Sequence, residues 1–133
     1  MHSHVIARVI ASVRHFHGLV AGGFSGCAQI GAGTVGLSCL SADESSLGYG
    51  KEGVGFWIIS AERPVADDPK SGLHFCFAAP SRQSVAAFYA AAMAHGGRDN
   101  GKPGVRKDYG PQYYAAFVFD PEGYRLEAYH GGK

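Results

Sequence analysis

The feature that most constrains this fold is a strand followed directly by a helix, a pattern that occurs twice along the chain. In the clearer copy, Leu73, Phe75 and Phe77 alternate with His74, Cys76 and Ala78. This period of two is typical of a strand with one strongly apolar face. The pair Pro80-Ser81 then ends the strand, and serine is a favourable N-cap for the helix that follows.

The helix is predicted from apolar residues spaced i, i+3, i+4 and i+7, which are Val85, Phe88, Tyr89 and Ala92. Gly96-Gly97 is expected to end it, since glycine accepts the left-handed conformation common after a helix. Residues 98–112 are polar and glycine-rich, which predicts a loop with at most a short strand at its start. Strands are then expected over Tyr113–Phe119 and Tyr124–His130, separated by a turn at Asp120–Gly123.

The first half repeats this order less clearly. A strand is expected over residues 4–9, then a helix that Ser12 caps and Gly22-Gly23 ends, then strands at Val35–Leu40 and Gly55–Ser60. The landmark pairs His4/His74, Phe16/Phe88 and Gly22/Gly96 are offset by 70, 72 and 74 residues, which predicts an internal repeat. A unit of about 65 residues buries little surface alone. We therefore expect one α+β domain over 1–133, with modules at about 1–62 and 72–130 and a linker at 61–71.

Charge and cysteine usage exclude several classes of protein. Twelve Lys and Arg against eleven Asp and Glu give a net charge of +1, which argues against a general nucleic-acid binder. No apolar run reaches the roughly 18–20 residues that span a membrane. The three cysteines, Cys27, Cys39 and Cys76, are an odd number without a CxxC pair. A reducing, cytoplasmic location is therefore expected.

The strand faces predict a cluster of polar residues. Alternation places Leu126 and Ala128 towards the helix, and Arg125, Glu127 and Tyr129 on the opposite face. The same reasoning places His4 and His74 on the face away from the helices. Two imidazoles and one carboxylate form a ligand set that suits Fe(II), Mn, Zn, Ni or Co.

Several motifs resemble the glyoxalase / bleomycin-resistance / extradiol dioxygenase superfamily, also called the vicinal oxygen chelate proteins. The most specific is the run from Asp120-Pro121-Glu122-Gly123 to Glu127, and Gly72–Phe77 followed by Pro80-Ser81 is also similar. The resemblance implies two βαβββ modules whose curled mixed sheet surrounds a cavity. It further implies a metal site at His4, His74 and Glu127, with Glu127 as the catalytic residue, and a homodimer.

One departure from the family narrows the expected reaction. Glyoxalase I and methylmalonyl-CoA epimerase generally add a fourth ligand from the last strand of the first module. Here that strand, Gly55–Ser60, has neither a carboxylate nor an imidazole. The resemblance therefore favours a three-ligand enzyme of the lyase, thiol transferase or dioxygenase type, acting on a small oxygenated substrate.

Two alternatives stay open. One is a metal-free protein that binds or sequesters a small molecule in the same cavity, and the other is a family member in which His74 and Glu127 are only structural. The residues expected to contact a substrate are Trp57, Arg106, Tyr109, Tyr113 and Tyr129. The alternative to a substrate contact is a position on a solvated loop for Arg106 and Tyr109, and packing in the core for Trp57.

Overall fold

A computed structural model describes residues 10–13, 34–43, 46–60, 74–120 and 123–131 of the 133-residue chain. In chain order the elements are β1 (Ile10–Val13), β2 (Ser38–Ala42), β3 (Ser46–Gly50), β4 (Val54–Ser60), β5 (His74–Ala78), α2 (Arg82–Ala94), β6 (Arg98–Val105), β7 (Tyr114–Phe119) and β8 (Arg125–His130). No helix in these described ranges is long and apolar enough to span a membrane.

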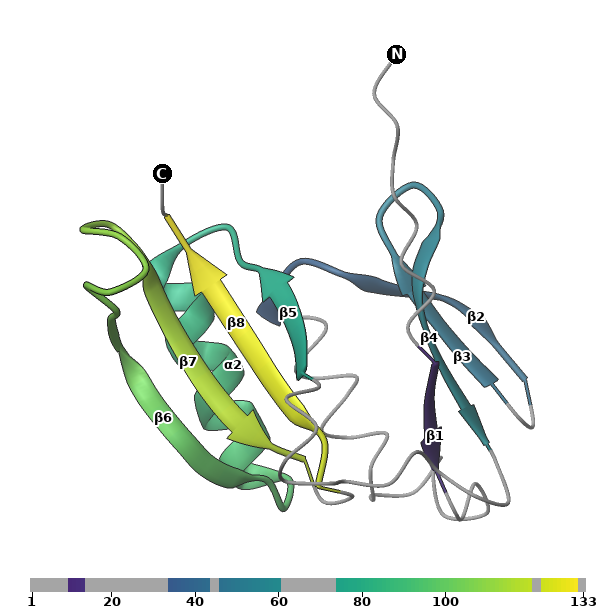
Figure 1. The fold of residues 1–133 in the computed structure, drawn as a ribbon. Helices are drawn as coiled ribbons and strands as arrows, with labels where there is room; N and C mark the ends of the chain where they lie inside the picture. The colour runs from purple at the N-terminus through teal and green to yellow at the C-terminus, as the bar shows by residue number, and fades with distance from the viewer. Residues whose placement is uncertain (1–9, 14–33, 44–45, 61–73, 121–122, 132–133) are drawn as a thin grey trace.

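The strands form two four-stranded sheets of the same design (Figure 1). Sheet 1 has the order β1-β4-β3-β2 and sheet 2 the order β5-β8-β7-β6. In each sheet the first strand pairs parallel with the last strand of its half, and the other pairings are antiparallel. The shared order confirms the predicted α+β class, although the two sheets do not close into one continuous barrel.

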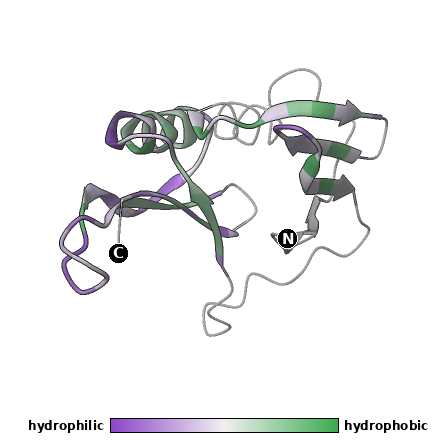
Figure 2. Ribbon diagram, turned by 90° about the horizontal axis from the view of Figure 1, so that it is seen from above, coloured by the Kyte–Doolittle hydropathy of each residue, from purple (hydrophilic) through white to green (hydrophobic). Residues whose placement is uncertain are grey.

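Helix α2 covers one face of sheet 2 and forms the core with it. Ser81 is the N-cap, as predicted, and its hydroxyl accepts a hydrogen bond from the Ser84 amide at 3.0 Å. The buried residues that pack together here are Ala79, Val85, Phe88, Ala92, Ala116, Val118 and Ala128. Viewed from above, α2 and sheet 2 form two layers, with sheet 1 to one side (Figure 2). The opposite face of sheet 2 is therefore free of α2.

Apolar contacts between described residues join the halves of the chain. Val35, just before β2, is buried in the core between α2 and sheet 2. The Phe56 ring on β4 packs edge-on against Phe75 and Phe77 of β5, with ring centroids 6.4 and 5.3 Å apart. The two sheets are thus coupled by apolar packing as well as by the chain.

Three local predictions are wrong. Ile10–Val13 form strand β1, where the sequence predicted that Ser12 caps a helix; the β-branched residues pair parallel with β4 instead. Residues 98–105 form the eight-residue strand β6, which accommodates its glycines at two register shifts. The strand expected at Val35–Leu40 begins only at Ser38, and β3 was not predicted.

Several predictions lie outside the described residues. These are the strand at 4–9, most of the first helix, and the linker at 61–71. The division into two modules therefore stays a prediction.

Candidate functional site

The open face of sheet 2 carries the polar residues that the strand alternation predicted. In the β5–β8 pair, His74 lies opposite Arg125 and Cys76 opposite Glu127. The turn before β8 sets this register. The Asp120 side chain accepts a hydrogen bond from the Tyr124 amide at 2.8 Å, and Gly123 has a φ of +92°. The Asp-Pro-x-Gly motif therefore fixes where Glu127 lies on its strand.

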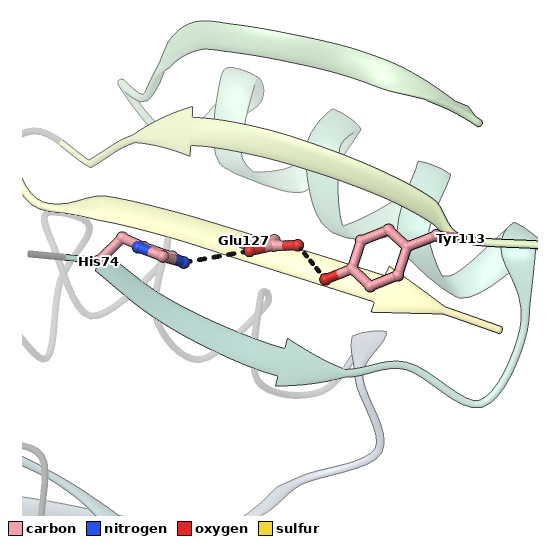
Figure 3. Close-up of polar contacts among 3 residues, drawn as sticks. All are labelled: His74, Tyr113 and Glu127. Atoms are coloured by element: carbon pink, nitrogen blue, oxygen red, sulfur yellow. Dashed lines mark hydrogen bonds and ion pairs between the residues drawn. The ribbon is translucent and has the colours of Figure 1, made fainter. Parts of the chain in front are cut away.

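Glu127 is the centre of the cluster. It is only 4% exposed, although it lies on the face away from α2. One carboxylate oxygen, Oε2, lies 3.3 Å from His74 Nε2, and the other, Oε1, accepts a hydrogen bond of 2.6 Å from the Tyr113 hydroxyl (Figure 3). A buried carboxylate needs such partners, because an uncompensated charge is expensive away from water.

The Tyr113 ring is held by its aromatic neighbours. It stacks on Tyr129 with a centroid distance of 5.1 Å and an interplanar angle of 7°, and Tyr109 meets it edge-on at 5.4 Å. Tyr109 is 67% exposed at the mouth of the site. These contacts fix the direction from which Tyr113 approaches Glu127.

Two groups beside Glu127 keep their protons at neutral pH. Cys76 is exposed as a whole residue, but desolvation of its thiol raises its pKa to about 12, and the negative charge of Glu127 and a hydrogen bond to it add to this effect. Burial and the hydrogen bond to Glu127 also raise the pKa of Tyr113. At pH 7 the site therefore holds a neutral thiol and a neutral phenol around the carboxylate.

A cavity of about 570 Å³ opens over this cluster. Its size is typical of a small-molecule site. It is lined by His74, Asn100, Asp108, Tyr109, Tyr113, Phe117, Arg125, Leu126 and Glu127. All of these lining residues come from β5 and the chain that follows it, so sheet 1 contributes none of them.

The pair His74 and Glu127 fits a divalent metal ion in donor chemistry and spacing. Two ligands about 2.0–2.2 Å from one ion, at octahedral or tetrahedral angles, lie about 2.8–3.6 Å apart, and the observed separation is 3.3 Å. Tyr113 would serve as the hydrogen-bonding partner that orients a ligating carboxylate. In the described ranges no three His, Cys, Asp or Glu side chains are grouped to hold a metal. A third His, Cys, Asp or Glu ligand from this chain would therefore come from outside those ranges.

The structure brings most of the predicted site residues together. His74, Tyr109, Tyr113 and Glu127 line the cavity, and Tyr129 supports it through its ring. Arg106 lies over the Phe117 ring at 5.3 Å, beside the cavity. Trp57 is on β4 of sheet 1, packs over Gly48, and is not among the lining residues. His4 lies outside the described residues.

The sequence analysis did not single out Cys76, Asp108 or Arg125 as site residues. The signal for Cys76 and Arg125 was present, because each is two residues from a predicted ligand on the same strand face. Asp108 carried no such signal, since it belongs to a turn whose path follows from the unpredicted strand β6.

The family profile of the Glyoxalase/Bleomycin resistance protein/Dioxygenase superfamily matches residues 35–128, which include every residue named above as lining the cavity. The chain belongs to this superfamily. The match confirms the resemblance identified from the Asp-Pro-x-Gly motif. No curated protein sequence matches the chain.

Solved structures of superfamily members share the fold. A glyoxalase/bleomycin resistance protein from Albidiferax ferrireducens T118 is 27% identical, with a TM-score of 0.76 over 93% of this chain and 97% of that one. A glyoxalase/bleomycin resistance protein/dioxygenase family enzyme from Burkholderia phytofirmans PsJN is 14% identical, with a TM-score of 0.65 over 94% of this chain and 97% of that one. A bleomycin resistance determinant encoded on the transposon Tn5 is 15% identical, with a TM-score of 0.54 over 94% of this chain and 96% of that one. The last two show the fold alone.

Proposed function

We propose that this superfamily member binds a divalent metal ion through His74 and Glu127 and acts on a small oxygenated substrate held in the adjoining cavity. The observation that carries the proposal is the buried Glu127 carboxylate, whose two oxygens meet a histidine and a tyrosine at a cavity of about 570 Å³. His4 is the proposed third ligand. Fe, Mn, Zn and Ni all suit such a donor set.

The roles of this chain's own residues follow from their contacts. The Tyr113 hydroxyl donates its hydrogen bond to Oε1 of Glu127, and the other carboxylate oxygen, Oε2, faces His74. Glu127 is the proposed catalytic residue, because a carboxylate at the cavity is placed to accept a proton from a bound substrate. A divalent ion, when bound, supplies a Lewis acid that polarises a substrate oxygen. Tyr109 and Phe117 line the space in which the substrate would lie.

Metal content measured by elemental mass spectrometry tests the proposal. The untagged protein would be reconstituted anaerobically with Fe, Mn, Zn or Ni and then desalted. We expect near one metal ion per chain, lost in both His74→Ala and Glu127→Gln. The matched controls are His95→Ala and Glu52→Gln, since His95 bonds the Ala91 carbonyl at a helix end and Glu52 lies exposed between β3 and β4. Both control variants should bind as much metal as the wild type. A wild-type protein that binds no metal under any of these conditions would contradict the proposal.

A metal-free ligand-binding protein is the second candidate. The observation in its favour is that His74 and Glu127 already pair with each other, while the described residues offer no group of three ligands. This candidate predicts binding of small molecules that is unchanged by a chelator. Isothermal titration with and without EDTA distinguishes the two candidates.

The proposed active form is a homodimer. Among the described residues, only those of the second half of the chain line the cavity. Sheet 1 therefore does not cover the side of the cavity that faces solvent. A second chain would supply that cover. Sedimentation equilibrium should then give twice the 14.0 kDa mass of the chain, and a monomer at working concentration would contradict this part of the proposal.

A further inference from the structure

Strand β6, the outer strand of sheet 2, has an extra residue where it borders the cavity (Figure 1). Its register with β7 matches Asp99 to Val118 and Gly101 to Phe117, so Asn100 is the extra residue of a β-bulge. Bulges often re-aim a side chain next to a functional site. Here the re-aimed residue, Asn100, lines the cavity.

Local contacts hold this bulge in place. The Gly101 amide donates a hydrogen bond of 2.9 Å to the Asp99 side chain, and the Tyr89 hydroxyl on α2 donates to the same carboxylate. Gly101 has a φ of +148°, a conformation that residues with side chains rarely adopt. The position of Asn100 is therefore fixed by its neighbours in the fold.

The Phe117 ring provides a flat apolar surface beside the bulge. A Cβ atom at Gly101 would lie 3.0 Å from Phe117 Cδ2, so the ring leans over a glycine of the edge strand. Arg106 lies 5.3 Å from the ring centre, more than the 3.5–4.0 Å of about centred contact, and therefore sits to one side, near Gly104. Phe117 still lines the cavity, whereas Arg106 does not.

The strand register places these groups in one row across the sheet. Phe117 on β7 pairs with Glu127 on β8 and with Gly101 on β6. Neighbouring strands lie about 4.7–4.9 Å apart, so the backbones of Glu127 and the bulge are about 10 Å apart. The cavity thus has a carboxylate at one end of the row, an aromatic ring in the middle and the Asn100 amide at the other end.

The polar chemistry of the lining favours a neutral group at the Asn100 end. Two carboxylates, Asp108 and Glu127, line the cavity with one guanidinium, Arg125, which also lies 5.9 Å from the centre of the Phe119 ring. A ligand carboxylate would add a third negative charge to this lining. An asparagine amide both donates and accepts hydrogen bonds, and a carboxamide offers the same pair of groups in return.

We propose that the cavity takes a flat aromatic ligand with a neutral donor–acceptor group such as a carboxamide, and that Asn100 recognises this group. The ring lies on Phe117, and a hydroxyl at its other end donates to the Glu127 carboxylate. This inference names the substrate class of the proposed function and rests on the same cavity. The contacts at Asn100 and Phe117 themselves require no metal.

The test uses EDTA-treated protein, so that it is independent of metal binding. Isothermal titration would compare 4-hydroxybenzamide with three relatives: phenol, which lacks the amide, 4-hydroxybenzoate, which is anionic, and 4-hydroxycyclohexanecarboxamide, whose ring is not aromatic. The variants are Asn100→Ala and Phe117→Leu. The matched control is Gln83→Ala, since Gln83 is an exposed amide on α2, on the other face of sheet 2.

We expect 4-hydroxybenzamide to bind about three- to tenfold more tightly than each relative. Asn100→Ala should weaken 4-hydroxybenzamide by a similar factor and leave phenol unchanged. Phe117→Leu should abolish the preference for the aromatic ring, and Gln83→Ala should change nothing. The unfolding midpoint of each variant shows whether it is folded.

A measurement on the wild type makes the test independent of any variant. Asn100 is the only asparagine in the sequence, so selective ¹⁵N-asparagine labelling gives one pair of side-chain amide signals in an NMR spectrum. These signals should shift with 4-hydroxybenzamide more than with phenol.

Equal affinity for 4-hydroxybenzamide and its saturated relative would overturn the inference, as would tighter binding of 4-hydroxybenzoate or an unchanged affinity in Asn100→Ala. Absence of binding by every probe would also overturn it. Failure of the metal proposal looks different, because the metal-content measurement then fails while 4-hydroxybenzamide still binds to the EDTA-treated protein.

Discussion

At the scale of single residues, the account depends on what surrounds Glu127. A carboxylate that is 4% exposed is stabilised by the Tyr113 hydroxyl at 2.6 Å and by His74 at 3.3 Å. The sequence could predict that His74 and Glu127 share a strand face, because alternation along β5 and β8 is regular. It could not predict the partnership with Tyr113, since that depends on how the turn before β7 returns the chain to the sheet.

Tyr113→Phe should lower the free energy of unfolding by about 1–3 kcal/mol, because it leaves a buried carboxylate oxygen without its hydrogen-bond donor. Urea denaturation measures the change. Tyr109→Phe is the control, since a 67% exposed tyrosine should change stability by no more than about 0.5 kcal/mol. Equal stability of Tyr113→Phe and the wild type would show that the bond to Glu127 contributes nothing.

Cys76 should react slowly with iodoacetamide at neutral pH. Its pKa is raised to about 12 by burial and by Glu127, and only the thiolate is nucleophilic. The rate should rise with pH, and Glu127→Gln should speed the reaction by lowering the pKa of the thiol. Peptide mapping by mass spectrometry over about pH 7 to about pH 10 measures this rate for the specific cysteine. Glu52→Gln is the control, and an unchanged rate in Glu127→Gln would show that the carboxylate does not act on the thiol.

At the scale of elements, regular patterns were predictable and irregular ones were not. The strand β5, the helix α2 and the Ser81 cap follow from period-two and period-3.6 spacing. Strand β6 was missed because its two glycines and one proline favour a loop locally, while pairing with β7 through two register shifts makes it a strand. Tertiary pairing outweighed local preference in the same way at β1.

The register also refines the internal repeat. Ser12 pairs with Ile59, one residue before the end of β4, and Ala78 pairs with Tyr129, one residue before the end of β8. The first strands are thus offset by 78 − 12 = 66 residues and the last by 129 − 59 = 70. In the second half, His74 lies four residues before Ala78. The corresponding residue in the first half, four before Ser12, is position 8. The register thus matches His74 with position 8, so the choice of His4 as the third ligand follows from the family resemblance and not from this repeat.

Close packing within sheet 1 predicts a difference between two glycines. A Cβ at Gly48 would lie 2.9 Å from Val54 Cγ1 and 3.0 Å from the Trp57 ring, whereas one at Gly55 meets nothing within 4 Å. Gly48→Ala should therefore cost about 1–3 kcal/mol of unfolding free energy, as overpacking does. Gly55→Ala in the neighbouring strand is the matched control and should be neutral or slightly stabilising. Thermal unfolding followed by circular dichroism measures both, and a neutral Gly48→Ala would contradict this packing.

At the scale of the whole molecule, the two halves of the chain share their packing. Val35 enters the core of α2 and sheet 2, and Phe56 on sheet 1 contacts Phe75 and Phe77 on sheet 2. The sequence predicted a single domain only from the small size of each module. The sequence could not identify Val35 and Phe56 as residues that couple the halves, because neither belongs to a motif.

This coupling predicts cooperative unfolding. Trp57, the single tryptophan of the chain, reports on sheet 1, and helical circular dichroism reports on α2 among the described elements. The urea transitions seen by these two probes should coincide in the wild type, as they do in a two-state protein. Phe56→Ala, which removes the ring contacts between the sheets, should lower both midpoints. Separate transitions in the wild type would show that the halves unfold independently.

The central claim is that His74 and Glu127 hold a metal ion at the cavity, and anomalous diffraction from crystals grown with Zn²⁺ tests it most directly. The account predicts one strong peak per chain about 2.0–2.2 Å from both His74 Nε2 and Glu127 Oε2. That peak should be missing in Glu127→Gln crystals grown the same way. A wild-type map with no peak between these two side chains, or with zinc bound only elsewhere, would contradict the claim.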